Sequence, residues 1–378
     1  MDLKISIGIL AYNESISIST TLESLLQQSL FNDSQYCKFI ELVIVPNGCT
    51  DQTAEISRNT LATLVKQRVQ PPAIRWQVCE VAQPGKSNAW NLYVHEFSDP
   101  AADYLFLMDA DIQLLEPDTL RNMIDCLETA TERWISVDNP VKDVSIKKNK
   151  SLMEKLSVQM SKESLRDDDD PYICGQLYCG RAAKLRQVWM PPGLPVEDGF
   201  LRAMVCTDLF RSKEGIRAVK RAPNASHSFE AYISIPSLLR HEKRLVVGST
   251  INACLFGYLW ANCNEQQDAG SLIKRNNEQN PLWLHELIQQ LRQENGWWLI
   301  PSSYLFRRFE NLQRFPGLKA VRRFPLALIA FLVDLLVFFQ ANREIHKGNG
   351  LGYWGVSQQA NVQEDQSIDQ LSRHRGAA

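Results

Sequence analysis

The chain has 378 residues, of which 44% are hydrophobic and 22% charged, enough for one large α/β domain with an appendage or for two domains. Its formal net charge of −2 excludes a global basic field, so nucleic acid is a poor candidate partner. Nine cysteines without a Cys-x-x-Cys pair indicate reduced thiols in a cytosolic setting, not a disulfide framework or a zinc site.

The first third of the chain alternates predicted strands with predicted helices. The strands are expected at 4–13, 39–48, 74–81 and 104–108, and the helices at 15–29, 49–67 and 85–97. This order predicts an α/β fold with a mainly parallel wound sheet and helices on both faces. Ligands bind such sheets at the carboxyl ends of the strands, where Asn13, Asn47, Lys86 and Asp109 are expected.

The strand "YLFLM" at 104–108 ends in two carboxylates, Asp109 and Asp111. One interpretation is a solvated turn whose acids cap the next helix. The other is a site for a hard divalent ion, Mg²⁺ or Mn²⁺, which would offset two adjacent negative charges and share its remaining positions with water and phosphate oxygens.

The pattern is less regular from about Arg133 onward. A basic run at 142–166 precedes four aspartates at 167–170, which we interpret as a solvated loop and not a calcium site. A strand is expected at 173–180, and a Pro- and Gly-rich loop at 190–201 leads into a helix. The chain after Lys347 is polar and is expected to form a tail without a core.

Five motifs carry a resemblance to a known family. They are "ISIGILAYNE", "VPNGCTDQT", "GKSNAWN", "FLMDADI" and "LPVEDGF", in that order. Over residues 3 to 250 the chain resembles family 2 glycosyltransferases with the GT-A fold. The resemblance implies an inverting, metal-dependent transfer of a sugar from a nucleotide-diphospho-sugar to a hydroxyl of a glycan or lipid-linked acceptor.

The resemblance also implies a donor site at the strand ends. Asp111 would be the direct metal ligand, and Asp109 would contact the ribose or support the metal. Asn47 stands where many relatives carry Asp, so the nucleoside of the donor stays open between uridine, guanosine and thymidine. The alternative role of Asn47 is that of a turn residue without nucleotide contact. Further nucleotide-sugar contacts are implied for Tyr12, Asn13, Glu14, Lys86 and Asn88, with a solvated helix-end lysine as the alternative for Lys86.

The general base is implied at "PVEDGF". Asp198 would take the proton of the acceptor hydroxyl, with Glu197 as the rival base or as the residue that orients it. The alternative for Asp198 is a helix N-cap. The pair Gly175 and Gln176 could line the acceptor cleft.

A later segment, "LLRHEKRLVVG", offers groups that could close over the diphosphate. Arg240 and Arg244 suit phosphate oxygens, whereas the lone His241 suits a structural role better. The chain lacks the Gln-x-x-Arg-Trp motif of processive polymer synthesis, so transfer of one sugar or a few is expected.

The C-terminal part predicts helices and contact with a membrane. Residues 324–339 are apolar except for Asp334, and six Lys or Arg residues between 307 and 323 and three aromatic residues between 297 and 304 precede them. We expect membrane-surface contact through 297–339 at the cytoplasmic face of the plasma (inner) membrane; the alternative is a buried amphipathic helix. The predicted domains are 1–255 (catalytic), 256–345 (helical) and 346–378 (tail).

Three other functions compete with this hypothesis. A sugar-phosphate nucleotidyltransferase would carry a Gly-rich loop after its first strand, but "LAYNESISIS" has no glycine. An aspartyl phosphatase would place its acids after the first strand. A non-catalytic sugar-nucleotide or glycan-binding protein would not need Asp109, Asp111 and Asp198.

Overall fold

The structure is a computed structural model that describes residues 3–68, 72–146, 171–213, 215–231, 234–312 and 318–348. The predicted loop of four aspartates, most of the basic run before it and the tail from 349 onward lie outside these ranges.

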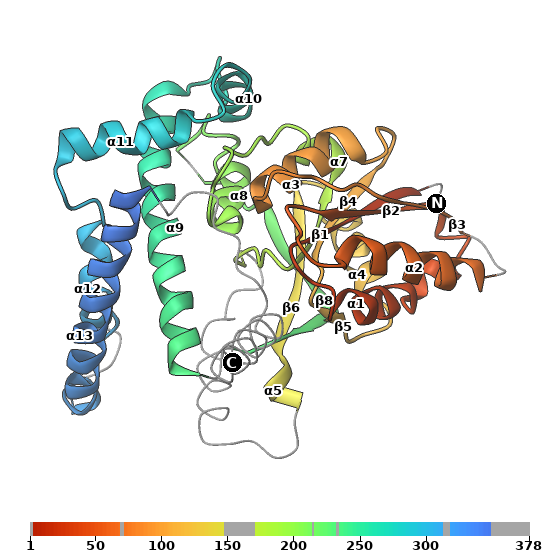
Figure 1. The fold of residues 1–378 in the computed structure, drawn as a ribbon, viewed down its shortest axis with the longest axis horizontal. Coiled ribbons are helices and arrows are strands. Elements are labelled where there is room, and N and C mark those ends of the chain that lie inside the picture. The colour runs from red at the N-terminus through yellow and green to blue at the C-terminus, as the bar shows by residue number, and fades with distance from the viewer. Residues whose placement is uncertain are drawn as a thin grey trace, which may run out of the picture.

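Within the described residues one eight-stranded sheet has the strand order β3-β2-β1-β4-β7-β6-β8-β5 (Figure 1). The strands are β1 (Leu3–Ala11), β2 (Cys37–Pro46), β3 (Ala73–Val78), β4 (Tyr104–Asp109), β5 (Gln113–Leu114), β6 (Ile135–Lys142), β7 (Leu177–Arg181) and β8 (Val219–Phe229).

The first four strands are parallel, as predicted: β1 pairs with β2 and β4, and β2 pairs with β3. The second half is mixed, because β7 runs antiparallel to both β4 and β6, and β5 runs antiparallel to β8. This reversal of strand direction determines which segments meet at the candidate site. An antiparallel β7 begins where β4 ends, so the residues just before Leu177 lie beside Asp109.

Helices cover both faces of the sheet and create two hydrophobic cores, which confirms the predicted class. In β1, Ile5, Ile7 and Ile9 point to the face covered by α1 (Ile18–Leu26), α2 (Thr53–Lys66) and α4 (Thr119–Glu128). The opposite face carries α3 (Lys86–Leu92), which continues as a π-helical turn (Tyr93–Phe97), α7 (Ala182–Leu185) and α8 (Glu197–Cys206). A short α5 (Asp143–Ile146) follows β6.

The long helix α9 (Ile235–Asn262) stands beside the sheet and joins it to a helical appendage on its far side (Figure 1). Its buried residues Ile251, Leu255 and Leu259 belong to the same core as α8, so this apolar part of α9 packs against the rest of the protein. The appendage consists of α10 (Ala269–Gln279), α11 (Trp283–Asn295), α12 (Ser302–Leu312) and α13 (Leu318–Lys347). The predicted domain boundary at 255 lies inside α9, and the division into domains stays a prediction.

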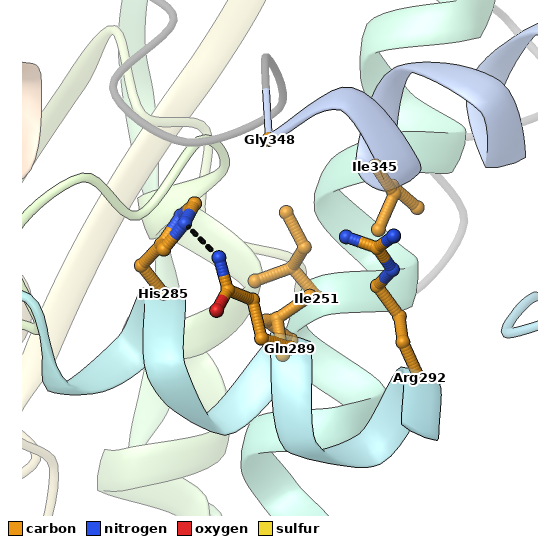
Figure 2. Close-up of a pocket in the computed structure, with 7 residues that line it drawn as sticks. Ile251, His285, Gln289, Arg292, Ile345 and Gly348 are labelled. Carbon is orange, nitrogen blue, oxygen red and sulfur yellow. Dashed lines mark hydrogen bonds between the residues drawn. The ribbon is translucent and has the colours of Figure 1, made fainter. Parts of the chain in front are cut away.

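One helical segment of the described chain, Pro236–Asn262, has the length and apolar composition that a membrane span requires. Core helices of soluble proteins meet the same criterion. A small cavity of about 10 Å³ lies where α9, α11 and the end of α13 meet (Figure 2). It is lined by Ile251, Arg292 and the hydrogen-bonded pair His285 and Gln289, and it is large enough for about one water molecule.

The apolar run at 324–339 forms the middle of α13, and its two faces differ sharply. Asp334 is 5% exposed and Phe338 fully buried, so the one acid of the run points inward. Seven large apolar side chains on the other face are 42–67% exposed: Phe324, Leu328, Ile329, Leu332, Val333, Leu336 and Phe339. Successive members are one, three or four positions apart, so they lie along one side of the helix. We call this set of seven residues the α13 stripe.

Candidate active site

The polar residues that the sequence analysis placed at strand ends lie along one edge of the sheet. The pairing sets Ala11 of β1 beside Pro46 of β2, and Leu10 beside Asp109 of β4. The segments that follow these strands, at 12–14, at 47 and at 109–111, therefore meet at the same edge, as expected for parallel strands.

Lys86, the first residue of α3, occupies the centre of this edge. Its Nζ lies 2.7 Å from Asp109 Oδ1 and 2.8 Å from Glu197 Oε1, and it donates to the carbonyl of Gly175 at 3.0 Å. The side chain is only 12% exposed, which rejects the solvated-lysine alternative. An ammonium has three N–H donors, and all three have a protein partner here.

This contact sets the charge states of the buried groups. Burial opposes the charge of Lys86, but the attraction of Asp109 and Glu197 outweighs it and raises the lysine pKa. Burial would raise the pKa of Glu197, yet Lys86 outweighs it and lowers that pKa. For Asp109 burial prevails over Lys86, so its pKa is raised. These shifts favour the charged forms of both Lys86 and Glu197.

The acids form two pairs, Asp109 with Asp111 and Glu197 with Asp198, and the second acid of each pair has a raised pKa. Burial, and then repulsion from Glu197, raises the pKa of Asp198 to about 6. Burial, and then repulsion from Asp109, raises the pKa of Asp111 to about 6. The alternative interpretation of Asp198 as a helix N-cap is wrong, because the N-cap of α8 is Val196. Asp198 Oδ1 instead accepts a hydrogen bond from Gly199 N–H at 2.7 Å.

The segment before β7 forms a wall of the site. A Cβ atom at Gly175 would lie 2.7 Å from Glu197 Oε1, so only glycine fits there without a shift. The carbonyl of Gln176 accepts a bond from Asp109 N–H at 2.9 Å. The two residues predicted for the acceptor cleft therefore touch both acid pairs through main-chain and side-chain contacts.

Three residues predicted for nucleotide contact also hold the loops together. Asn13, at a φ of 55°, accepts a bond from Thr50 N–H at 2.8 Å, and buried Glu14 accepts one from the Ser17 hydroxyl at 2.6 Å. Asn47 donates to the carbonyl of Gln83 at 2.8 Å, while its buried Oδ1 has no hydrogen-bond partner among the described residues.

Two more predicted contacts, Asn88 and Tyr12, border the same loops. Asn88 donates at 3.2 Å to the Gln83 carbonyl that Asn47 also binds, so these two amides converge on one atom. Tyr12 directly follows β1 and is half-buried.

The basic residues of α9 separate into near and far groups. Arg244 lies near enough to Asp109, Glu197 and Asp198 that its positive charge favours the ionised form of each acid, although the net pKa of Asp109 and of Asp198 is still raised. Arg240 is exposed, and no contact in the described part of the chain joins it to the acids. Burial, and then the charge of Arg244, lowers the pKa of His241.

Asp109 and Asp111 fit a hard divalent ion by their chemistry. They offer carboxylate oxygens, and the raised pKa of Asp111 reflects negative charge that a cation would offset. Neither acid caps the next helix, since the N-cap of α4 is Asp118. No group of three or more His, Cys, Asp or Glu side chains with metal-binding geometry occurs among the described residues, so an ion would complete its shell with water and substrate oxygens.

Sequence reasoning missed a buried pair next to this wall. His227 Nδ1 lies 2.7 Å from Asp138 Oδ2, and both side chains are fully buried. The ring's other nitrogen lies 3.3 Å from Gln176 Oε1. Only a single acid within the apolar run at 134–141 hinted at this pair, and 89 residues separate its members.

The chain is similar to known glycosyltransferases. The model of Glycosyl transferase family 2 matches residues 6–187, just under half of the chain. The mannosyltransferase PcManGT from Pyrobaculum calidifontis, solved with GDP-Man and Mn²⁺, has a TM-score of 0.53 and 13% identity, with 92% of this chain and 87% of that chain covered. This likeness establishes the fold. No curated protein sequence matches the chain.

Two further solved structures are similar at lower scores. S. aureus TarS 1–349 has a TM-score of 0.43 and 13% identity and covers 92% of both chains. Glucosyl-3-phosphoglycerate synthase from Mycobacterium tuberculosis has a TM-score of 0.42 and 17% identity, with 66% of this chain and 79% of that chain covered.

Replacing Lys86 by methionine is expected to lower the free energy of unfolding by about 3–5 kcal/mol at pH 7.5, because two buried carboxylates lose their cation. The loss should shrink toward pH 5. In the native protein the lowered pKa of Glu197 contributes stability that is lost as the pH falls. In the variant, protonation of Asp109 or Glu197 at low pH relieves the repulsion between these two carboxylates. Urea unfolding at several pH values measures both effects.

The matched control is Lys274→Met. Lys274 is half-exposed and lies 3.9 Å from Glu278, so its loss should change stability by no more than about 0.5 kcal/mol. A loss in the Lys86 variant that is the same at every pH would indicate packing alone and contradict the electrostatic account.

Proposed function

We propose that this chain, whose residues 6–187 belong to glycosyl transferase family 2, transfers a sugar from a nucleotide-diphospho-sugar to a hydroxyl of a glycan or lipid-linked acceptor, with inversion, metal dependence and no processivity. The enzyme is a glycosyltransferase by family. The donor, the acceptor, the stereochemistry and the role of each residue are proposals.

The observation that carries the proposal is the position of Lys86 between two acid pairs. Asp109 belongs to the pair proposed for the metal and the donor, and Glu197 belongs to the pair proposed for the base. One ammonium therefore sets the spacing between the leaving-group side and the acceptor side of the cleft. Holding reacting groups in one geometry is a major part of transfer catalysis.

The environments of Glu197 and Asp198 support Asp198 as the general base. Glu197 is paired with Lys86 and keeps its charge, so it is a poor proton acceptor. Asp198 has a pKa of about 6, which suits a base that works near neutral pH. Because Gly199 N–H holds Oδ1, the atom proposed to take the proton is Oδ2.

The proposed reaction is a single displacement. The acceptor oxygen forms a bond to the anomeric carbon as the bond from that carbon to the diphosphate oxygen breaks, and the hydroxyl proton passes to Asp198. Nucleoside diphosphate leaves, and the configuration of the anomeric carbon inverts. Arg244, whose charge acts on Glu197 and Asp198, would attract the departing diphosphate.

Asp109 and Asp111 would hold the metal, which when bound offsets charge on the diphosphate. The GDP-Man and Mn²⁺ in the Pyrobaculum calidifontis structure support Mn²⁺ as the first ion to test. On the nucleotide side, the unpartnered Oδ1 of Asn47 is suited to accept a hydrogen bond from a base N–H, with Tyr12, Asn13, Glu14 and Asn88 around it.

The same proposal places the enzyme at the cytoplasmic face of the plasma (inner) membrane. The seven exposed apolar side chains of the α13 stripe could insert into the headgroup region of a membrane. Asp334 is buried on the opposite side of the helix, so its charge would not enter the membrane. Trp297 and Trp298, 47% and 36% exposed, adjoin the stripe through the contact of Trp297 with Phe339. Such an orientation would suit a lipid-linked acceptor.

With Mn²⁺ and a membrane lipid extract, we expect one sugar nucleotide among UDP-, GDP- and dTDP-sugars to release nucleoside diphosphate, because the site combines a metal pair with a base. EDTA should abolish release, and Asp111→Ala should lower it at least about 100-fold. Asp198→Asn should lower acceptor-stimulated turnover by about 10²–10⁴-fold and leave donor affinity unchanged. Coupled nucleoside diphosphate detection and calorimetry measure these quantities.

Glu278→Ala, on the exposed surface of α10, serves as the control and should keep full activity. Release of pyrophosphate in place of nucleoside diphosphate would identify a nucleotidyltransferase instead. Donor binding without turnover, in a folded protein, would identify a binding protein.

The pH dependence of kcat/KM should show an acid limb near pH 6. Asp198 acts only when unprotonated, and burial together with Glu197 raises its pKa to about 6; Asp111 loses its proton in the same range. Below that pH the rate should fall at least tenfold per unit. Steady-state kinetics between pH 4.5 and 8.5 test this, and a limb near pH 4 would contradict the assignment of the base.

The α13 stripe should bind anionic vesicles. The double variant Leu332→Lys with Leu336→Lys places two charges where 54% and 67% exposed leucines lie, and it should weaken binding to phosphatidylglycerol vesicles more than tenfold. Flotation assays measure this. Leu282→Lys, at a 64% exposed leucine outside the stripe, is the control. Equal binding by all three proteins would reject the stripe as a membrane surface.

A further inference from the structure

The buried pair of Asp138 and His227 lies next to the proposed active site, yet the mechanism above does not use it. The two side chains come from neighbouring parallel strands, β6 and β8, and neither is accessible to solvent. Burying an ion pair costs more free energy than burying apolar side chains of the same size. The pair is thus an expensive element of the core unless it orients something.

The ring of His227 connects the pair to the site. Its Nδ1 meets Asp138 at 2.7 Å, and its Nε2 lies 3.3 Å from Gln176 Oε1. Burial alone would lower the pKa of His227, but Asp138 outweighs burial and raises it to about 10. Nδ1 faces a carboxylate oxygen and Nε2 faces an amide oxygen, and both of these atoms accept hydrogen bonds, so this arrangement makes both ring nitrogens donors.

Gln176 receives the second of these bonds on its side-chain oxygen, which the Cys174 thiol also approaches, at 3.4 Å. A donating imidazolium fixes which end of the amide faces the ring, because the amide NH₂ cannot accept a bond. The NH₂ group is then directed away from His227. No acceptor for it is seen among the described residues, and Gln176 is half-buried beside Asp109.

We propose that Asp138 and His227 form a positioning unit that locks the amide of Gln176, so that its NH₂ group donates to a hydroxyl oxygen of a sugar in the cleft. His227 and Asp138 are positioning residues, since they act through Gln176. The inference rests on the proposed function for the identity of the ligand, a sugar hydroxyl, which belongs either to the donor or to the acceptor.

The first test needs no turnover. The chain has six histidines, so ¹⁵N-histidine NMR can resolve each ring, and the loss of one set of signals in His227→Gln assigns His227. We expect an imidazolium that persists above pH 8 and whose Nε2 signal shifts in Gln176→Ala. A neutral ring at pH 7, or a His227 spectrum that is the same in Gln176→Ala, would overturn the proposal even if no donor is ever found.

The second test uses the donor that the sugar-nucleotide panel identifies. Gln176→Glu keeps an oxygen for His227 and leaves the buried pair intact, but it removes the NH₂ donors. We expect kcat/KM to fall about tenfold in Gln176→Glu and about tenfold in His227→Gln, the effect of one hydrogen bond. The double variant should lose no more than the worse single variant, because both changes remove the same contact.

The kinetic parameters distinguish the two sources of the hydroxyl. A rise in donor KM indicates a donor sugar, whereas a fall in kcat at constant donor KM indicates the acceptor. The control is His95→Gln: His95 contacts the carbonyl of Val188 at 2.9 Å, away from the acids, and its loss should leave kcat/KM unchanged. Multiplicative losses in the double variant would show that His227 is merely structural and overturn the proposal.

If the wild-type enzyme releases no nucleoside diphosphate from any donor, the proposed function fails. The NMR result then decides the positioning unit separately.

Discussion

The proposed active site depends on one buried ammonium, that of Lys86. Three protein groups surround its nitrogen, and two of them are carboxylates from helices and strands that are far apart in the chain: Asp109 on β4 and Glu197 on α8. Burial alone would raise the pKa of Glu197, and Lys86 is the largest of the influences that lower it. The lysine thereby joins the start of α8 to the end of β4 and to the segment before β7.

The fold supplies this convergence through a change of strand direction. Parallel strands β1, β2 and β4 bring the loops at 12–14, at 47 and at 109–111 to one edge. The antiparallel β7 then returns the chain to the same edge from the other side, so that Gly175 and Gln176 close the site next to Asp109. Neither a purely parallel sheet nor a purely antiparallel one would place these segments together.

Sequence reasoning predicted the part of the architecture that depends on local periodicity. The alternating isoleucines of β1 and the apolar run of β4 identified strands and, with them, the edge where Asn47 and Asp109 lie. It could not predict contacts made across the fold. Lys86 was expected to contact the nucleotide-sugar, and the sequence did not indicate that it also pairs with Asp109 and Glu197. The pair of Asp138 and His227 was missed because a single acid in an apolar run was the only hint of it and 89 residues separate its two members.

Some expected residues carry structural roles that only the coordinates reveal. Asn13 was selected for nucleotide contact, and it also receives the amide of Thr50 to join two loops. Asp334 is the one charged residue in the apolar run at 324–339, and helical spacing turns it inward and leaves the seven stripe residues outside. A one-dimensional pattern reports how often a charge occurs, whereas the helix determines the direction in which it points.

The close approach at Gly175 limits how this enzyme could acquire new substrates. A side chain at that position would displace the carboxylate of Glu197, which Lys86 holds, so a change at Gly175 would disturb the ion pairs as well as the wall. A laboratory search for altered sugar specificity would therefore do best to vary the flanking positions and leave Gly175 unchanged.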